Sequence, residues 1–352
     1  MQHFKYRVLL FIIFPILVSC QDSVNDTNLT DAEWLIPASE VYDGGPGKDG
    51  IPALSNPNLL ENELIDYMKD SDLIIGIKID NQVRGYPHPI LNWHEIINDQ
   101  INENYFSVTY CPLTGSTIGI NREIDGDITT FGVSGLLYNS NLIPYDRATN
   151  SNWSQMKMEC VNGKLKGREF DFVPTFETNW ATWKKMFPKA IVVSSNTGHE
   201  RRYSYYPYGS YRGDESLYFP VSNVNSELNL KERVHGIIEN NKVYAFRFNL
   251  FADETKLFKK QIGGNNYLIV GNSTENFIVS FYNNLSGGTE LNFEVVKNSL
   301  PIILTDNEGN KWDIFGYAVE GNRKGQRLTS TKSLIAYWFA WGAFYPDISI
   351  IN

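Results

Sequence analysis

The feature of this sequence that most constrains its fold is a set of similar segments that lie about 160 residues apart. "GIKIDNQVRGY", which begins at Gly76, resembles "GIIENNKVYAF", which begins at Gly236. "NWATWKKMFP" contains Trp183, and "YWFAWGAFYP" places Trp341 at the same point of its pattern. Several markers keep nearly one offset along the chain, so chance similarity is the weaker explanation. The sequence therefore predicts two similar units that arose by internal duplication.

Both units are rich in short apolar runs punctuated by Asn, Asp and Gly, a pattern typical of β-strands. Each unit closes with aromatic residues that stop before Pro188 or Pro346, which predicts a short terminal helix. We assign the apolar run Leu334–Phe344 to the second of these helices and not to a membrane span. A further helix is predicted in "NWHEIINDQI", where Trp93 and three isoleucines share one helical face. The expected fold is mainly β, of the α+β type, with strands in "LIIGIKI", "YFSVTY", "STIGI", "ITTFGVS", "YLIVG" and "FIVSFY".

Composition and pattern divide the chain into six segments. The core of the protein is expected in the two β-rich units, which a Tyr-, Gly- and Pro-rich crossover connects. The segments are a lipoprotein signal peptide at 1–19, a flexible tether at 20–33, a loop-rich arm at 34–72 that carries "GGPGKDGIPAL", the first unit at 73–194, the crossover at 195–232 and the second unit at 233–352.

The N-terminus has the pattern of a bacterial lipoprotein signal. Lys5 and Arg7 precede the apolar run Val8–Val18, which is too short to cross a bilayer and has the length of a signal-peptide core. The run leads into Cys20, which would become the lipidated first residue of the mature chain. The sequence therefore predicts a membrane partner through a lipid anchor, and a location in the bacterial cell envelope that faces the periplasm or the outside.

The charge balance argues against nucleic acid as a partner. The chain has a formal net charge of -9, and its basic residues are scattered. If Cys20 is lipidated, Cys111 and Cys160 are the thiols that remain, and outside the cytoplasm they could form a disulfide.

The two units differ most around one turn, "TYCPLTGST". When the units are aligned on Tyr105 and Tyr267, Cys111 falls near Ser273 and "CPLTG" is replaced by "STENF". A residue that only the fold requires should recur in both units, whereas a residue of one site occurs once. The first unit is therefore the expected functional half. The residues found in this unit alone are His94, Glu95, Cys111 and Arg147.

These four residues are the candidate catalytic set. Cys111 is either a reactive thiol, whose pKa a nearby His94 or Arg147 would lower, or a buried and inert thiol. His94 and Glu95 are either a general base and the group that orients it, or residues on the polar side of a helix that have no chemical role. Cys111 and His94 are also candidate metal ligands, although the histidines have no recognised ligand spacing. No cofactor is assigned.

The chain resembles the bacterial domain-of-unknown-function family numbered 3179. The resemblance rests on "KDGIPAL", "NWHEIIND", "TYCPLTG", "FGVSGLLYNSNL", "YDRATNSNWSQ", "PYGSY" and "KERVHG" in this order, and it runs from about Trp34 to Pro346. It implies a secreted or lipid-anchored bacterial protein without an assigned reaction. The usual central motif of the family is similar to Tyr-Cys-Pro-Leu-Cys-Gly, and its selenoprotein members imply redox chemistry. Cys111 matches the first cysteine of that motif, while Thr114 replaces the second, which argues against a dithiol here.

Three functions follow as hypotheses. The first is thiol-based redox activity at Cys111, as an oxidoreductase. The second is the binding of copper or zinc by Cys111 and a histidine. The third is a non-enzymatic binding or scaffolding lipoprotein, whose contact surface would be the groove between the units together with the crossover tyrosines.

Overall fold

A computed structural model describes residues 33–285, 289 and 291–352 of the chain, and the protein is mainly β within them. The predicted signal peptide, almost all of the tether and the lipidation residue Cys20 lie outside the described residues. Within the described part, no helix is long and apolar enough to span a membrane.

The first half contains two short α-helices and the strands that surround them. Its terminal helix α2 begins after Asn179, whose side chain accepts a hydrogen bond from the Thr182 amide and so caps the helix. The elements are β1 Val41–Asp43, β2 Leu54–Ser55, β3 Leu59–Glu61, β4 Leu73–Ile79, β5 Gln82–Pro87, α1 His88–His94, β6 Ile96–Ile101, β7 Asn104–Cys111, β8 Ser116–Asn121, β9 Glu123–Ile124, β10 Asp127–Ile128, β11 Phe131–Tyr138, β12 Asn141–Asp146, β13 Asn152–Ser154, β14 Glu159–Asn162, β15 Phe172–Val173, β16 Phe176–Asn179, α2 Trp180–Met186 and β17 Ile191–Val193.

The second half follows the crossover and repeats this order of elements. The α-helix in the described part of this half is α3, which again follows the last long strand of the half and precedes a proline. The elements are β18 Arg233–Glu239, β19 Lys242–Arg247, η5 Phe248–Leu250, β20 Lys256–Ile262, β21 Asn265–Asn272, β22 Phe277–Tyr282, β23 Phe293–Val295, β24 Ile302–Asp306, β25 Lys311–Asp313, β26 Ala318–Glu320, β27 Ser333–Tyr337, α3 Trp338–Phe344 and β28 Ser349–Ile351.

The sheets of the two halves have matching strand orders. The order β16-β4-β5-β17 in the first half corresponds to β27-β18-β19-β28 in the second, and β6-β7-β8 corresponds to β20-β21-β22. The meander β11-β12-β13-β14 corresponds to β23-β24-β25-β26. The first half adds β1, β2, β3 and β15 at sheet edges. Descent of both halves from one duplicated unit remains a prediction.

The repeated Gly and Trp residues form the same packing contact in each half. A Cβ atom placed on Gly76 would come within 2.7 Å of the Trp183 ring, and one placed on Gly236 would come within 2.5 Å of the Trp341 ring. Real Cβ contacts are not this close, so each strand needs glycine where the tryptophan of the terminal helix packs. Both tryptophans are fully buried.

A second repeated contact joins an aspartate to a tryptophan. Trp153 Nε1 donates to Asp146 Oδ2 at 3.0 Å, and Trp312 Nε1 donates to Asp306 Oδ2 at 2.9 Å. A buried indole N–H needs such an acceptor, which explains why both residues recur. These residues belong to the architecture.

The predicted helix in "NWHEIINDQI" was wrong over most of its length. Helix α1 ends at His94, and Ile96–Ile101 forms β6, which pairs with β7. Ile96, Ile97 and Ile101 are all fully buried, so this strand is covered on both faces. Such a strand lacks the polar alternation that distinguishes it from a helix. In the same way, the first four residues of Leu334–Phe344 belong to β27, and only Trp338–Phe344 is helical.

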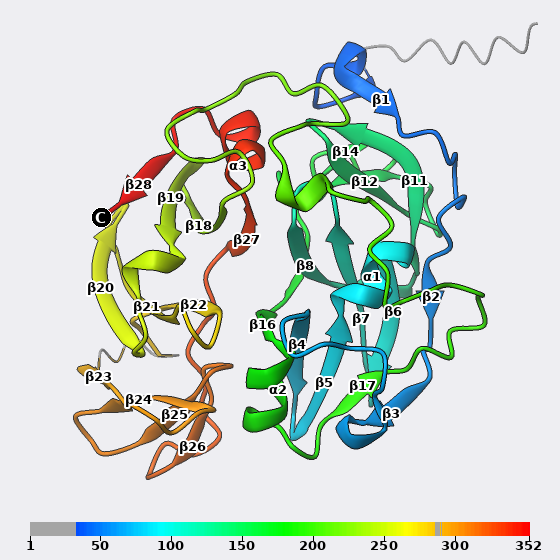
Figure 1. Cartoon of the computed structure of the whole chain (residues 1–352). Helices are drawn as coiled ribbons and strands as arrows, with labels where there is room; N and C mark the ends of the chain where they lie inside the picture. The colour runs from blue at the N-terminus through cyan, green and yellow to red at the C-terminus, as the bar shows by residue number, and fades with distance from the viewer. Residues whose placement is uncertain (1–32, 286–288, 290) are drawn as a thin grey trace, which may run out of the picture.

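The two halves lie side by side, and the crossover 195–232 passes from β17 over the first half and then across the top of the molecule to β18 (Figure 1). The crossover is tied to both halves, because Tyr211 Oη donates to the Leu113 carbonyl and the Phe339 amide donates to the Leu230 carbonyl. One hydrophobic cluster contains Cys111 and Leu113 together with Trp338 and Trp341. The halves therefore share a core.

Candidate functional site

The "CPLTG" segment forms the tight turn between β7 and β8. Cys111 and Ser116 are paired at the ends of the two strands, and Gly115 has a φ of +60°. A Cβ atom on Gly115 would lie 3.0 Å from the ring of Tyr337, and the Tyr337 amide donates to the Thr114 carbonyl at 2.8 Å. The end of β27, in the second half, therefore contacts this turn.

The Cys111 thiol is closed off from solvent. It is 1% exposed, its Sγ lies 3.7 Å from the Ser140 carbonyl oxygen, and the Leu142 amide donates to Sγ at 3.4 Å. Burial, reinforced by the negative charge of Glu95, raises the pKa of Cys111 to about 11, although hydrogen bonds from Thr114 and Leu142 oppose the shift. The thiol is protonated at neutral pH.

Glu95 lies near enough to Cys111 for its charge to act on the thiol, and its backbone is bonded to the strand that carries Cys111. It follows α1 with a φ of 56°, and its carbonyl accepts a hydrogen bond from the amide of Tyr110, the residue before Cys111, at 2.7 Å. A positive φ is uncommon for a glutamate. The carboxyl group is buried, and burial raises its pKa to about 7, with an opposing contribution from the hydroxyl of Tyr208, which donates to Oε1 at 3.2 Å.

A group of tyrosines covers the Cys111–Glu95 pair. Burial raises the pKa of each of these tyrosines, and the charge of a Cys111 thiolate would raise it further. Three of them come from the crossover and one from β27, so sequence reasoning, which had placed the crossover tyrosines at a groove or a junction, missed their relation to Cys111. The hydroxyl of Tyr206 is buried and has no hydrogen-bond partner within the described residues. The four are Tyr206, Tyr208, Tyr211 and Tyr337.

Thr114 is part of a buried polar network under the turn. Its hydroxyl lies 2.7 Å from Ser116 Oγ and accepts from Asn141 Nδ2 at 2.8 Å. Gln155 completes the network, since its Oε1 accepts from Ser116 at 2.5 Å and its Nε2 donates to Thr109 Oγ1 at 2.9 Å. Thr114 therefore has hydrogen-bond partners in this network, in addition to its hydrogen bond to Cys111.

His94 precedes Glu95 but has a separate set of contacts. Its Nδ1 lies 2.7 Å from the Pro52 carbonyl oxygen and its Nε2 lies 2.7 Å from Tyr203 Oη, which fixes Nδ1 as the protonated nitrogen. Burial lowers its pKa to about 4. Its ring lies 5.2 Å from that of His199. In this structure His94 is a neutral, fully partnered side chain.

Arg147 forms an ion pair near the surface. Its Nη2 lies 2.7 Å from Asp49 Oδ1, its Nη1 donates to Tyr145 Oη at 2.5 Å, and its side chain is 40% exposed. Asp49 belongs to the "KDGIPAL" motif, so this contact connects two of the quoted motifs. Among the four candidates, Glu95 lies close enough to Cys111 for its charge to raise the pKa of the thiol, whereas His94 and Arg147 have other partners.

Cys111 and Cys160 are free thiols. The Cys160 Sγ lies 3.3 Å from the carbonyl oxygens of Asn152 and Asn162, and burial raises its pKa to about 11. Within the described residues, no three His, Cys, Asp or Glu side chains are arranged to hold a metal ion. The described part of the chain therefore offers no third ligand for a copper or zinc ion at Cys111 and a histidine.

Comparison with protein families gives one match. Residues 48–348 match the model of the family described as "Protein of unknown function (DUF3179)". The chain belongs to the DUF3179 family. No curated protein and no solved structure matches it. The DUF3179 match spans both halves and the crossover, so the family unit includes the second half as well as the half that carries Cys111.

Proposed function

We propose that this protein is a lipid-anchored envelope protein in which Cys111 and Glu95 form a thiol redox site. The observation that carries the proposal is that a buried carboxyl group lies close enough to a buried thiol for its charge to raise the pKa of the thiol, among tyrosines of the crossover and of β27. Ionisable groups whose pKa is shifted by burial and by a specific neighbouring charge are concentrated at functional sites. A purely structural cysteine has no need of a neighbouring carboxyl group.

Glu95 suits the role of proton acceptor for the thiol. With a pKa of about 7, it is present in both protonation states at neutral pH. Its negative charge is one reason for the high pKa of Cys111. When the thiol proton moves to Glu95, that charge disappears, so the transfer is easier than the two separate pKa values suggest. The thiolate is the form that reacts.

The reaction class is thiol–disulfide exchange with an external disulfide. The Cys111 thiolate attacks one sulfur of the substrate, the substrate S–S bond breaks, and the departing thiolate takes the proton from Glu95. Because Thr114 occupies the position of a resolving cysteine, a second external thiol must release the mixed disulfide. The substrate reaches Cys111 only when the tyrosines that cover it move aside.

The pH dependence of alkylation tests this proposal. A Cys160→Ala background leaves Cys111 as the thiol that iodoacetamide can modify, and mass spectrometry follows the modified peptide. We expect slow labelling of the native protein that increases around pH 7, and we expect Glu95→Gln to remove that increase. Native Cys111 that stays unlabelled from pH 6 to 10, yet reacts fully in denaturant, would exclude the redox site.

The lipid anchor has its own test. Metabolic labelling with a fatty acid and membrane fractionation should show a labelled, membrane-bound chain, and Cys20→Ala should abolish both. Cleavage of the Cys20→Ala chain at another position with unchanged membrane binding would contradict the lipoprotein assignment.

A further inference from the structure

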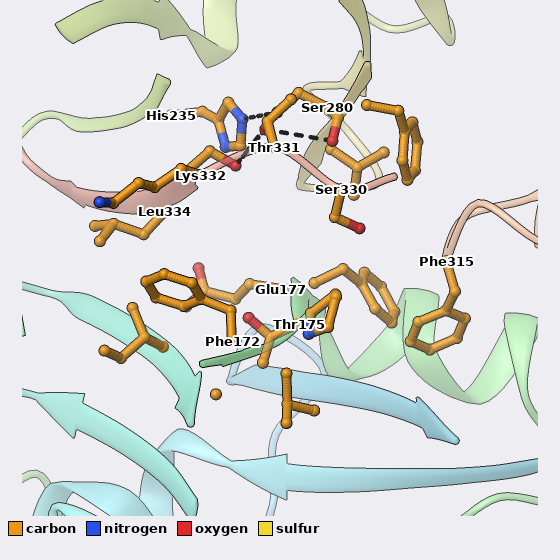
Figure 2. A pocket seen from close by; sticks show the side chains of 18 of the residues that line it. Phe172, Thr175, Glu177, His235, Ser280, Phe315, Ser330, Thr331, Lys332 and Leu334 are labelled. Atoms are coloured by element: carbon orange, nitrogen blue, oxygen red, sulfur yellow. Dashed lines mark hydrogen bonds between the residues drawn. The ribbon is translucent and has the colours of Figure 1, made fainter. Parts of the chain in front are cut away.

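A cavity of about 630 Å³ lies between the two halves, and Cys111 is not among its lining residues. Figure 2 shows its two walls: the segment Ser330–Lys332 of the second half faces Phe172 and Thr175 of the first half. A cavity of this volume is typical of a small-molecule site. Because both halves line it, the cavity exists only where the halves pack together.

One positive charge at this cavity has no counter-charge. The acids that the described residues contribute to the lining are both paired: Glu177 forms an ion pair with Arg233, and Glu169 lies 3.4 Å from Lys332 Nζ. Arg327 also lines the cavity, and no carboxylate of the described residues lies within 4.0 Å of its side-chain nitrogens. The paired charges cancel, so Arg327 leaves the lining with an excess of positive charge.

The contacts of Arg327 fix its guanidinium group but leave the two terminal nitrogens without partners. Nε donates to the Phe315 carbonyl at 3.2 Å, and the guanidinium carbon lies 4.7 Å from the centre of the Tyr317 ring. Asp313, which precedes this segment, is already paired with Lys78 at 2.6 Å. Within the described residues, Nη1 and Nη2 of Arg327 have no hydrogen-bond partner, and neither atom is buried. Two such nitrogens can bind a carboxylate in the bidentate geometry.

Most of the remaining lining is apolar. Phe172 lines one wall from the first half and Phe315 adds a ring from the second (Figure 2). The hydroxyl groups of Thr175 and Ser330 are among the few neutral polar groups that point into the space between the walls. Burial lowers the pKa of His235 to about 3, so this lining residue adds no charge at pH 7. The lining therefore suits a ligand that combines an apolar body with one anionic group.

We propose that this cavity binds a monocarboxylic acid with an apolar body, whose carboxylate pairs with Arg327. The carboxylate supplies the counter-charge that Arg327 lacks, and the apolar body displaces water from the phenylalanine rings. A cationic ligand is repelled by Arg327, and a neutral ligand leaves it unpaired. A dianion would need a second free cation, but Lys332 is paired with Glu169. This site is separate from the proposed redox site and does not depend on it.

Isothermal titration calorimetry of the full mature chain at pH 7 tests the proposal. The probes are octanoate and 3-phenylpropionate, which distinguish a linear from an aromatic body. The controls are octanamide, which is neutral, octylammonium, which is cationic, and succinate, which lacks the apolar body. We expect at least one of the two probes to bind, and we expect octanamide, octylammonium and succinate to bind at least about tenfold more weakly, the effect of one charge-assisted hydrogen bond.

Arg327→Gln should remove the preference for the carboxylate. The readout is the ratio of the octanoate affinity to the octanamide affinity, because a general effect on folding changes both affinities alike. Arg323→Gln is the matched control, since Arg323 is paired with Glu308 at 2.6 Å and does not line the cavity. We expect Arg327→Gln to lower the ratio about tenfold or more and Arg323→Gln to leave it unchanged.

NMR locates the bound ligand independently of these variants. In protein labelled with ¹³C-phenylalanine, the chain of bound octanoate, or the ring of bound 3-phenylpropionate, should give NOEs to Phe172 and Phe315, which line opposite parts of the cavity. Failure of both probes to bind, equal affinity for octanoate and octanamide, an unchanged ratio in Arg327→Gln, or binding without these NOEs would each overturn the proposal.

Discussion

The two halves of this protein build the same turn in two chemical forms. In the first half, Glu95 ends a short helix with a φ of 56°, and its carbonyl binds the amide of the residue before Cys111. In the second half, Asn272 lies opposite Phe277 as Cys111 lies opposite Ser116, and Lys256 pairs with Gly271 where the first half has Glu95 bonded to Tyr110. The strand register is shared, whereas the carboxyl and thiol groups belong to one half.

The halves also differ in what covers the turn. Cys111, Glu95 and Asn272, which occupies the position of Cys111 in the second half, are buried, whereas Lys256, at the position of Glu95, is exposed. The crossover tyrosines and Tyr337 lie over the first turn. The first half thus buries two ionisable groups whose pKa values burial raises, whereas the second half has a neutral amide and an exposed lysine at these positions. This difference is the strongest structural reason to assign the chemistry to the first half.

The largest expected effect concerns what the halves share. Trp183→Ala and Trp341→Ala should each lower the free energy of unfolding by about 3–5 kcal/mol, because each removes a fully buried indole that packs on a strand glycine. Urea unfolding measures both. Leu64→Ala is the control, since Leu64 is 61% exposed and its truncation should change stability little. A loss below about 1 kcal/mol for either tryptophan would show that the two contacts are not equivalent in energy.

The next effect concerns the buried carboxyl group that the second half lacks. In the folded protein the pKa of Glu95 is about 7, above its ordinary value of 4.5, so the unfolded chain loses this proton at lower pH. The wild type should therefore lose stability as pH rises from 4.5 to 7. Glu95→Gln removes this dependence, and its advantage over wild type should grow from near zero below pH 4.5 to about 3 kcal/mol above pH 7.

Comparison of the two proteins at each pH isolates Glu95. His94, whose pKa burial lowers to about 4, has the opposite pH dependence over much of this range, but it is present in both proteins and cancels in the difference. Thermal or urea unfolding at pH 4.5, 6, 7 and 8 provides the measurement. A constant difference across these pH values would mean that Glu95 is not the buried acid that the structure indicates.

The repeat in the sequence predicted much of this architecture. The paired glycines and tryptophans at Gly76, Trp183, Gly236 and Trp341 recur because one packing contact requires both residues, so the pattern carries three-dimensional information. The helix predicted over Ile96–Ile101 failed because a strand covered on both faces shows no alternation.

The site was harder to predict than the fold. Occurrence in one half selected His94, Glu95, Cys111 and Arg147 as one set, but it did not show which of them lie close together, because sequence does not reveal where a side chain points. His94 and Glu95 are consecutive, yet His94 contacts Pro52 and Tyr203. The crossover tyrosines lie about a hundred residues from Cys111 in the chain, and only the fold brings them to it.

A smaller effect is expected when the thiol, which the second half lacks, is replaced by a hydroxyl group. Cys111→Ser places a hydroxyl between the Ser140 carbonyl and the Leu142 amide, both of which it can bind, so stability should fall by only about 1 kcal/mol. Mixed-disulfide formation with an external disulfide should disappear. Cys160→Ser is the matched control, with a similar loss of stability and unchanged mixed-disulfide formation. If Cys160→Ser removes the mixed disulfide instead, the reactive thiol has been assigned to the wrong cysteine.

The smallest effect is expected at Arg147, where the second half has Asn307. Arg147→Asn breaks the ion pair with Asp49, but both side chains are more than a third exposed, so solvent screens the pair and the loss should be below about 1 kcal/mol. Added salt should reduce the loss further. Because Arg147 contacts Asp49 and Tyr145, the labelling rate of Cys111 should stay at the wild-type value. A large fall in that rate with stability intact would bring Arg147 back into the site, and would show that the site extends beyond the Cys111–Glu95 pair to the surface of the first half.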